Sequence, residues 1–452
     1  MKKIERSKIL LFAVLVIAIG MRSLVLIPAL KTPEKIRSND TPLYFKLATN
    51  LLKGNGFSSC SQTPFYPDTV RTPVYPLFLA TLFYLFGQSY EAVALAQVLI
   101  DIFTGIIIFF TGRKLFNPSI AFFAALFYAM GITNIPYTVI AIAETFLTFL
   151  LSVNIYFLVA YIKTYKVKYL IVGQLFWGLA VLCKPVVMFS LPIIVLLIFF
   201  SNKEKWKKGM MHNLVLVMVS SILVAPWIIR NKSITGQATI STVVEHDLLL
   251  YNAVHLKTYI EGRPGEEIAK ELLHVGKDPR GTIASCTNDY SDLAFYKSKA
   301  YEIIKLNLPT YIYLHLKADL NNLIPGVTKT LEIYGLTEGN KGTVAVLANQ
   351  GIFSAIDHYF GNNKKLILYF IPWILFHIFF LLFTLVGAIL LFKEKMFSEL
   401  ILLLFIGVYF VLIPGPMSAP RFFIPAVPFF SILAGIGFYF RPFFKRKRNA
   451  TT

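Results

Sequence analysis

Charged residues are scarce in this sequence. Only 15% of its 452 residues are Asp, Glu, Lys or Arg, whereas 56% are hydrophobic. Soluble domains carry about 25% charged residues on average. The composition therefore excludes an ordinary soluble protein for most of the chain, and it indicates a protein whose solvent is the lipid bilayer.

Acidic residues are also few. The chain has 24 Asp and Glu residues against 44 Lys and Arg, which gives a formal net charge of +20. In a soluble protein such an excess would indicate a nucleic-acid partner. Here much of the basic charge lies in short linkers between apolar segments, as the positive-inside rule requires. No nucleic-acid partner is therefore expected.

Cysteine is rare as well. The three cysteines are Cys60, Cys183 and Cys286, and no two of them have the spacing of metal ligands. Cys60 and Cys286 fall in segments that we expect outside the cytoplasm, where a disulfide can persist. Sequence alone does not decide whether they pair or stay free thiols. Both alternatives remain open at this point.

Long apolar runs dominate what is present. The first, from Ile9 to Leu30, is longer than the core of a signal peptide, and we interpret it as an uncleaved helix. Counting it, ten segments have about the length that a bilayer requires, although 118–136 and 169–183 are near the lower limit. The prediction is an all-α polytopic membrane protein with about ten transmembrane helices. The other segments are 92–112, 118–136, 138–162, 169–183, 185–200, 210–229, 366–392, 398–414 and 421–440.

The basic linkers predict the orientation. They alternate with connections that carry only Lys184 and Arg421, so they lie together on the cytoplasmic side. We therefore expect a multi-pass protein of a bacterial inner membrane with both termini in the cytoplasm. The basic segments are 112–116, 163–168, 201–208, 393–395 and the tail 441–449.

Two long segments then fall on the outer side. In the first, 31–90, leucines recur at helical spacing over 43–52, and the apolar piece 75–87 is too short to span. Both predict helices lying in the membrane interface. The second is a large polar loop in which only a short helix at 291–306 is predicted. Three regions follow: a membrane module 1–230, the outer loop region 231–365, and C-terminal helices with a basic cytoplasmic tail, 366–452.

Charged residues cluster at the predicted outer ends of the spans. A charge at a membrane face must be paired, solvated in a cavity, or functional. Two carboxylates and four cations converging on one face suit proton transfer and an anionic ligand such as a phosphate or a lipid diphosphate. The six residues are Asp40, Arg71, Glu144, Lys184, Arg230 and Arg421.

Each of these residues also has a structural interpretation. Asp40 in the sequence SNDTP suits a helix cap, and Lys184 can reach the interface with its long side chain. Arg71 and Arg421 can each anchor to lipid headgroups. Asp101, inside the second span, is interpreted mainly as the partner of another polar group within the bundle.

Several short motifs carry a family resemblance. The chain resembles the GT-C superfamily of polyprenyl-phosphate-sugar-dependent glycosyltransferases, and in particular bacterial relatives of protein O-mannosyltransferases and the lipid A aminoarabinose transferase. The motifs occur in the family's order and cover most of the membrane part. They are DTPLYFKLA, GNGF and RTPVYPLFLA between Asp40 and Ala80, AETF around Glu144, GLAVLCKP (178–185), APWIIRN followed by GQ (225–237), and PRFFIPAVP with LAG (420–435).

The resemblance implies roles for the clustered residues. Asp40 would be the catalytic base that deprotonates or orients the acceptor hydroxyl, and Glu144 would hold the sugar or the acceptor. The cations Arg71, Lys184, Arg230 and Arg421 would bind the donor phosphate, and Tyr44 and Tyr75, within the motifs, would bind substrate. A divalent metal is possible in this family, but Thr41 stands where some relatives have a second acid. Lys184 stands where many have Arg.

The function that we predict is transfer of a sugar from a polyprenyl-phosphate donor at the outer face. The acceptor is a lipid, a glycan or a protein. A lipid-borne donor fits because nucleotide sugars are cytoplasmic and the sequence lacks a Gly-rich nucleotide motif. The alternatives are a cell-envelope glycan polymerase or ligase, and a lipid-linked sugar flippase or transporter. A transporter would favour charges at the bilayer midplane and repeated halves, and the sequence has no internal repeat.

Overall fold

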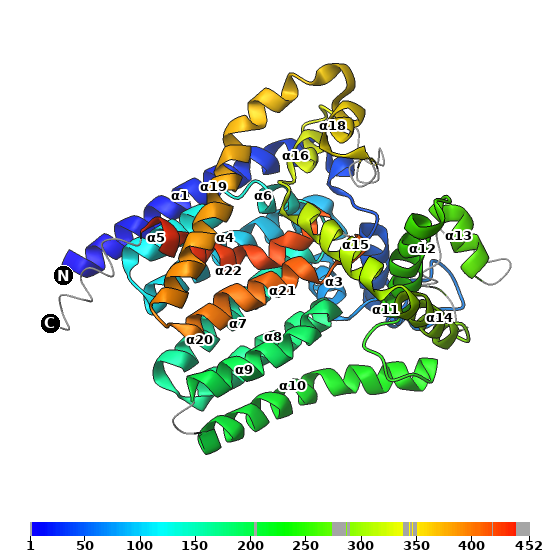
Figure 1. Ribbon diagram of the computed structural model, residues 1–452, viewed down its shortest axis with the longest axis horizontal. Coiled ribbons are helices and arrows are strands. Elements are labelled where there is room, and N and C mark those ends of the chain that lie inside the picture. The colour runs from blue at the N-terminus through cyan, green and yellow to red at the C-terminus, as the bar shows by residue number, and fades with distance from the viewer. Residues whose placement is uncertain are drawn as a thin grey trace.

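The computed structural model describes residues 2–202, 206–273, 286, 290–337, 343, 346, 350–417 and 419–439. Every regular element within these residues is helical (Figure 1), which confirms the all-α polytopic prediction. Six helices in this part of the chain are long and apolar enough to cross a bilayer. They are α1 (Lys2–Lys31), α4 (Tyr90–Leu115), α7 (Glu144–Thr164), α10 (Trp206–Thr235), α19 (Leu366–Lys393), and η9 (Pro420–Ala426) joined to α22 (Val427–Phe438).

Shorter apolar helices occupy the other predicted spans. The 12 residues of α5 rise only about 18 Å at 1.5 Å per residue, against about 30 Å for the hydrocarbon core. Ten spans therefore stays a prediction. The shorter helices are α5 (Pro118–Ala129), α8 (Val167–Cys183), η2 (Pro185–Ser190) with α9 (Leu191–Ser201), and the run α20 (Phe397–Leu400), η7 (Ile401–Phe405) and α21 (Ile406–Leu412).

Two predicted span boundaries are wrong. The segment 118–136 stops being one helix at Ala129, because the chain turns there and forms the short helix α6 (Asn134–Tyr137). The segment 138–162 becomes helical only at Glu144, although residues 139–143 are apolar and buried. A hydropathy average does not detect such turns, because the residues of a buried irregular segment can be as apolar as those of a helix.

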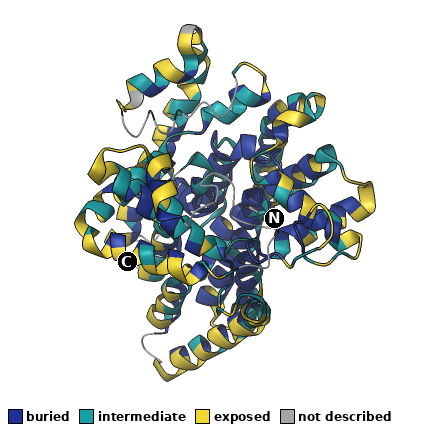
Figure 2. Cartoon of the chain, turned by 90° about the vertical axis from the view of Figure 1, so that its right-hand side faces the viewer, coloured by how far each residue is buried: buried dark blue, intermediate teal, exposed yellow. Residues whose placement is uncertain are grey.

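The helices pack into one bundle. The helix α7 lies between α4 and α8, and α22 contacts both α19 and α5. Figure 2 shows the buried residues gathered inside and the exposed ones at the periphery. The outward faces of α1, α10 and α19 carry exposed apolar side chains such as Phe12, Ile222 and Phe392. This exposure fits helices that face lipid.

The packing of α22 relies on small residues. A Cβ atom at Gly387 of α19 would overlap the carbonyl group of Leu433, and one at Gly437 would overlap that of Phe383. A Cβ at Gly435 would lie 2.7 Å from the backbone nitrogen of Ala124 in α5. These helices therefore approach each other backbone to backbone, as small residues allow in membranes.

A buried ion pair fastens α1 to the bundle. Arg22 Nε donates to Asp101 Oδ2 at 2.7 Å, and the two side chains are 1% and 3% exposed. Arg22 also donates to the carbonyls of Tyr128 and Ala129, at the end of α5. The expected pairing of Asp101 inside the bundle is confirmed. Sequence reasoning overlooked Arg22, although a charge inside an apolar run is the signal that had marked Asp101.

Three short helices precede α4 in the first of the two segments predicted to lie outside: η1 (Pro33–Ile36), α2 (Thr41–Leu52) and α3 (Val74–Phe86). The helices predicted over 43–52 and 75–87 are thus confirmed. In α2, Phe45, Leu47 and Ala48 are buried while Lys46 and Lys53 are exposed. This two-faced character is typical of a helix at an interface.

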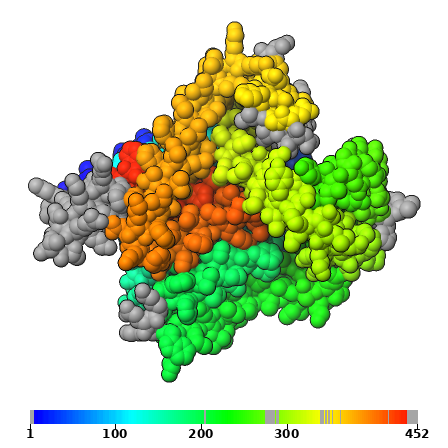
Figure 3. All heavy atoms as spheres, viewed as in Figure 1, coloured from blue at the N-terminus to red at the C-terminus, as the bar shows by residue number. Residues whose placement is uncertain are grey.

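The second outer segment forms a lobe with its own apolar core. Figure 3 shows it as a contiguous body beside the C-terminal helices, and in Figure 1 it lies at the end of the molecule away from the start of α1. The helix expected at 291–306 is confirmed as α14. The lobe contains α11 (Val243–Asp247), η4 (Leu248–Ala253), α12 (Val254–Glu261), α13 (Gly265–Leu272), α14 (Leu293–Leu306) and α15 (Leu308–Leu320), and η5 (Asn321–Leu323), α16 (Val327–Ile333), α18 (Ile352–Phe360) and η6 (Gly361–Asn363) lead on to α19.

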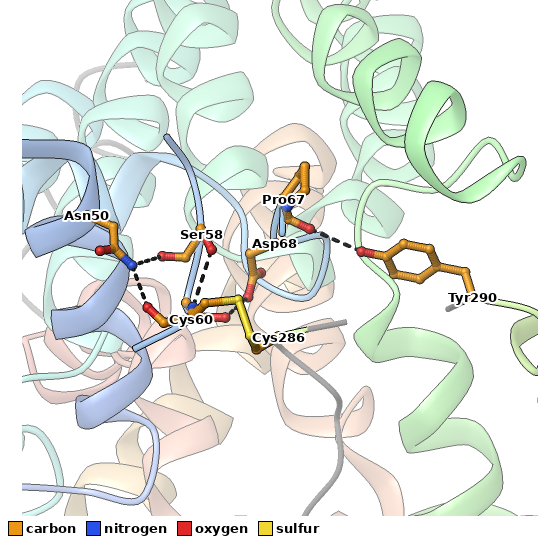
Figure 4. Close-up of a disulfide and its surroundings, with 8 residues drawn as sticks. Asn50, Ser58, Cys60, Pro67, Asp68, Cys286 and Tyr290 are labelled. Carbon is orange, nitrogen blue, oxygen red and sulfur yellow. Dashed lines mark hydrogen bonds between the residues drawn. A yellow bond between two sulfur atoms is a disulfide. The ribbon is translucent and has the colours of Figure 1, made fainter. Parts of the chain in front are cut away.

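A disulfide joins the two outer segments (Figure 4). Cys60 of the first segment bonds to Cys286 of the second, across 226 residues of sequence. Nearby, the hydroxyl of Tyr290 donates to the carbonyl of Pro67, and Asn50 donates to the carbonyls of Ser58 and Cys60. The pairing that the sequence left open is therefore present. The predicted basic tail, 441–449, lies outside the described residues.

Candidate active site

Asp40 lies directly before α2 and is held by two arginines. Its Oδ1 accepts from Arg71 Nη2 at 2.6 Å, and its Oδ2 accepts from Arg421 Nη1 at 2.9 Å. The side chain makes no capping hydrogen bond to α2, so the alternative of a simple helix cap is wrong. The carboxylate instead binds Arg421, which lies 381 positions away in the sequence.

Glu144 forms the second half of the same network. It is the first residue of α7 and is buried, with Oε1 2.8 Å from Nζ of Lys184 and 3.8 Å from Nε of Arg421. Arg421 thus contacts both carboxylates. The structure therefore brings together five of the six charged residues that the sequence had singled out.

Two threonine hydroxyls fix the elements that carry these charges. Thr41 Oγ1 donates to the carbonyl of Ala141, which ties the start of α2 to the chain that leads into α7. Thr72 Oγ1 donates to the carbonyl of Cys183, which ties the residue after Arg71 to the residue before Lys184. A threonine-to-carbonyl hydrogen bond therefore lies next to the Asp40–Arg71 pair and another next to the Glu144–Lys184 pair.

Asp68 shapes the loop that presents Arg71. Its Oδ1 accepts from the backbone N–H groups of Val70 and Arg71, both at 2.9 Å, and its Oδ2 accepts from Ser59. A carboxylate that binds the N–H groups two and three residues ahead makes an Asx-type turn. Sequence reasoning had not selected Asp68, because no membrane span ends there.

Of the two candidate tyrosines, Tyr44 lies against Arg71 and Tyr75 lies against Tyr44. The Arg71 guanidinium lies 5.2 Å from the ring centroid of Tyr44, and the rings of Tyr44 and Tyr75 meet edge to face at 4.8 Å. Burial raises the pKa of the Tyr44 hydroxyl, so that group stays protonated and can donate. The hydroxyl of Tyr75 already donates to Gln97 at 2.8 Å, so Tyr75 supports Tyr44 from behind.

Arg230 lies apart from the network. Its Nη1 donates to the carbonyl of Asp68 at 2.8 Å, and its guanidinium lies 4.4 Å from the ring centroid of Trp227 and 5.4 Å from that of Phe57. Within the described residues no hydrogen bond or ion pair joins it to Asp40 or Glu144. Arg230 is therefore bound to the loop around Asp68.

The cations keep Asp40 ionised. Burial opposes its charge, but Arg71, Arg421 and Lys184 outweigh this effect and lower the pKa of Asp40 to about 2. Three basic side chains, Arg71, Lys184 and Arg421, face the carboxyl groups of Asp40 and Glu144, so basic groups outnumber acidic ones by one in this network. In addition, Arg71 Nε is buried without a hydrogen-bond partner among the described residues. An anion is the complementary ligand.

The carboxylates of this network do not suit a divalent metal ion. Hard divalent cations take several oxygen ligands, whereas Asp40 and Glu144 both face Arg or Lys, and Thr41 supplies no carboxylate. Nowhere in the described part of the chain do three His, Cys, Asp or Glu residues lie close enough to hold a metal. We therefore assign no step of the chemistry to a metal.

One further carboxylate near the network was missed from sequence. Asp247 ends α11 in the outer lobe, and Arg71, Asp40, Lys184 and Arg421 all act on its charge. It lies in a polar loop that matches no motif, away from any span end. No signal in the sequence could have selected it, because its relation to the network depends on the folding of the lobe.

A protein-family model matches part of the chain. The family model described as dolichyl-phosphate-mannose-protein mannosyltransferase matches residues 70–229. This stretch contains Arg71, Tyr75, Glu144 and Lys184 and ends one residue before Arg230. No curated protein is similar enough in sequence to count as a match.

Solved structures share the fold at low identity. The apo oligosaccharyltransferase of Archaeoglobus fulgidus superposes with a TM-score of 0.52 at 14% identity, over 98% of this chain and 52% of that one. Its complex with zinc and sulfate gives 0.50 at 13%, over 97% and 50%. ArnT from Cupriavidus metallidurans bound to undecaprenyl phosphate gives 0.45 at 11%, over 97% and 62%.

The chain thus spans about half the length of the archaeal structures that it matches. Their similarity extends over nearly all of this chain, so it concerns the whole bundle and not one helix pair. Together with the family match, this agrees with the resemblance seen in the sequence motifs. The chain accordingly has the fold of the GT-C membrane glycosyltransferases, and its residues 70–229 match the mannosyltransferase family model within that group.

Proposed function

We propose that this protein is an inverting glycosyltransferase of a bacterial inner membrane. It moves a sugar from a polyprenyl-phosphate donor to a hydroxyl of a lipid, glycan or protein acceptor at the extracytoplasmic face. The observation that carries the proposal is the network in which Arg71 and Arg421 hold Asp40 while Lys184 and Arg421 hold Glu144. The family match supports a sugar donor carried on a lipid phosphate.

The charges fit the bond that must break. When the bond between the anomeric carbon and the phosphate oxygen opens, negative charge develops on the leaving phosphate. Fixed cations that are aimed at such developing charge stabilise the transition state. Arg71, Lys184 and Arg421 supply them, and guanidinium groups match phosphate oxygens in pairs. Arg230, already engaged by Asp68, would contact the donor only from the edge of the site.

The acids fit the incoming group. Asp40 accepts a hydrogen bond from the acceptor hydroxyl and so orients it for attack on the anomeric carbon, from the side opposite the phosphate. Glu144, which is more deeply buried, binds hydroxyls of the sugar. The Tyr44 hydroxyl donates a hydrogen bond to the bound substrate. Holding both reactants in line in this way is worth several orders of magnitude in rate.

A transfer assay tests the proposal. The purified full chain is given a panel of polyprenyl-phosphate sugars with membrane extract as acceptor, and release of polyprenyl phosphate is followed. We expect release by the wild type with one class of donor. Asp40→Asn should reduce it by about 100-fold or more. The control Asp357→Asn changes an exposed residue whose ion pair within the described residues is with Lys364, and it should leave release unchanged.

Two results would contradict the proposal in different ways. Wild-type turnover by folded Asp40→Asn would remove Asp40 from the chemistry. No release from any donor by folded wild-type protein would reject the donor class and favour a flippase or a ligase.

A further inference from the structure

The segment before α11 is docked beside the candidate site. The backbone N–H of Thr242 donates to the carbonyl of Thr69 at 3.0 Å, and the hydroxyls of these two threonines lie 3.2 Å apart. Ser241 Oγ donates to the carbonyl of Val70. The outer lobe is thus attached to the residues directly before Arg71, and α11 starts at that attachment.

The end of α11 is held in place as well. Asn252 Nδ2 donates to the backbone carbonyl of Asp247 at 2.9 Å, and the hydroxyl of Tyr311 donates to Asn252 at 2.9 Å. The π-helix η4 begins at the next residue, Leu248. Single π-helical turns are frequent at functional sites, because they redirect the side chains beside them.

The carboxylate of Asp247 is not engaged in the way that its neighbours are. Both oxygens of Asp40 accept from arginines, and Glu144 accepts from Lys184. The side chain of Asp247 has no hydrogen bond or ion pair among the described residues. Among the described residues, nothing therefore competes for its lone pairs.

Burial dominates the ionisation of Asp247. It raises the pKa of the carboxyl to about 7; the charge of Asp40 acts in the same direction, and Arg71, Lys184 and Arg421 oppose it. The charges of Asp40, Arg71 and Arg421 also act on the pKa of Tyr251, one turn further on. From α14, which packs against α11, Lys297 acts on Glu245, and the ring of Tyr296 lies against His246. Of these groups, Glu245 and Tyr296 are buried in the lobe, whereas Lys297 is exposed.

We propose that Asp247 is the catalytic residue that takes the proton from the acceptor hydroxyl, while Asp40 orients that hydroxyl. This inference rests on the proposed glycosyl transfer. The acceptor oxygen forms its bond to the anomeric carbon, and the bond from that carbon to the phosphate oxygen breaks with its electron pair going to the phosphate. The hydroxyl proton passes to Asp247, which later releases it to water.

The division of labour follows from the hydrogen bonds that hold Asp40 and are absent around the described Asp247 side chain, and proton affinity supports it. A carboxylate with a pKa of about 2 binds a proton weakly at neutral pH, whereas a group that titrates near neutrality is suited to general-base catalysis. Asp40 is also fixed by two charge-assisted hydrogen bonds, which would have to weaken if it took up the proton. Asp247 has no such bonds to lose.

The pH dependence of donor turnover tests the inference. For wild type we expect kcat/KM to rise with pH and level off above about 7, because protonated Asp247 is inactive. Asp247→Asn should lose this rise and fall about 100-fold or more, with release of polyprenyl phosphate as the readout. Asp247→Glu, which keeps the carboxyl group, should recover part of the rate together with a pH-dependent limb. Asp357→Asn serves as the control.

The outcomes separate the two proposals. Folded Asp247→Asn that turns over at the wild-type rate, or at a lower rate with the wild-type pH rise, would overturn the role of Asp247 and leave the transferase intact. A pH-independent Asp247→Glu that is no faster than Asp247→Asn would overturn it too. Absence of release by wild type at every pH would overturn the proposed function and this inference together.

Discussion

Arg421 is the residue that joins the two halves of the candidate site. It donates to Asp40 at 2.9 Å and approaches Glu144 at 3.8 Å, so one guanidinium neutralises part of both acids. A planar, forked group can do this, whereas an ammonium is a point charge. If Arg421 is lost, two carboxylates face the donor phosphate with less cationic charge between them.

We therefore expect Arg421→Ala to weaken donor binding by about tenfold or more, since charge-assisted hydrogen bonds contribute about 1.5–3 kcal/mol each. Arg421→Lys should give an intermediate loss. The measurement is titration of the purified protein with the productive polyprenyl-phosphate sugar, with the exposed Arg263→Ala, which pairs with Glu261 and Glu271, as control. Unchanged donor affinity in Arg421→Ala would remove this residue from the phosphate site.

The charged residues show where sequence reasoning succeeds at this scale. Asp40, Glu144, Lys184 and Arg421 were identified because alternating spans bring their outer ends to one face, and a charge there is costly without a purpose. Arg230 satisfied the same rule, yet its guanidinium turns to Asp68 and two aromatic rings. The rule gives the membrane face on which a residue lies, but not the direction in which its side chain points.

At the scale of elements, hydropathy predicted the helices better than their ends. The run from 118 to 136 is apolar throughout, but its helix ends at Ala129. There Arg22, a residue of α1, donates to the last carbonyls of α5. A partner that is 107 residues away leaves no mark on a local average. The same holds for α7, whose first residue, Glu144, binds Lys184 at 40 positions' distance in the sequence.

The contact of α19 with α22 gives a prediction for this scale. A Cβ at Gly387 would overlap the backbone of Leu433, so Gly387→Ala must push the two helices apart. We expect a loss of about 1–3 kcal/mol in stability, as for overpacked cores, and a lower thermal midpoint of the purified protein. Because η9 carries Arg421 and continues directly into α22, donor turnover should fall as well.

The matched control is Gly20→Ala in α1, where an added Cβ meets nothing within 4 Å. That change should leave the thermal midpoint unchanged or raise it, since Ala favours a helix over Gly by about 1 kcal/mol. Equal midpoints for Gly387→Ala and Gly20→Ala would mean that the two helices do not pack as closely as described.

At the scale of the whole molecule, the two outer segments are joined to each other by a disulfide and by hydrogen bonds. The disulfide between Cys60 and Cys286 and the hydrogen bonds from residues 241–242 to 69–70 join parts of the chain that sequence reasoning had treated separately. The sequence predicted a large loop there but not its fold, because the loop matches no motif and its helices are short. The position of Asp247 depends on this docking and so could not be predicted.

The disulfide and the basic linkers argue for the same orientation. Disulfides persist in oxidising compartments, and basic linkers stay in the cytoplasm. Lys270 of the outer lobe has a side chain that is 63% exposed, and Lys166 lies in an exposed linker on the other side. We expect a membrane-impermeant maleimide to label Lys270→Cys in intact cells, and Lys166→Cys only after the membrane has been opened.

The native cysteines do not interfere, because two are paired and Cys183 is buried; the parent protein should give only background labelling. The opposite pattern would place the network of Asp40 and Arg421 in the cytoplasm. Water-soluble nucleotide sugars are available there, so the physical reason for a lipid-borne donor would be lost, even with the fold unchanged. The orientation therefore tests the donor class independently of any activity measurement.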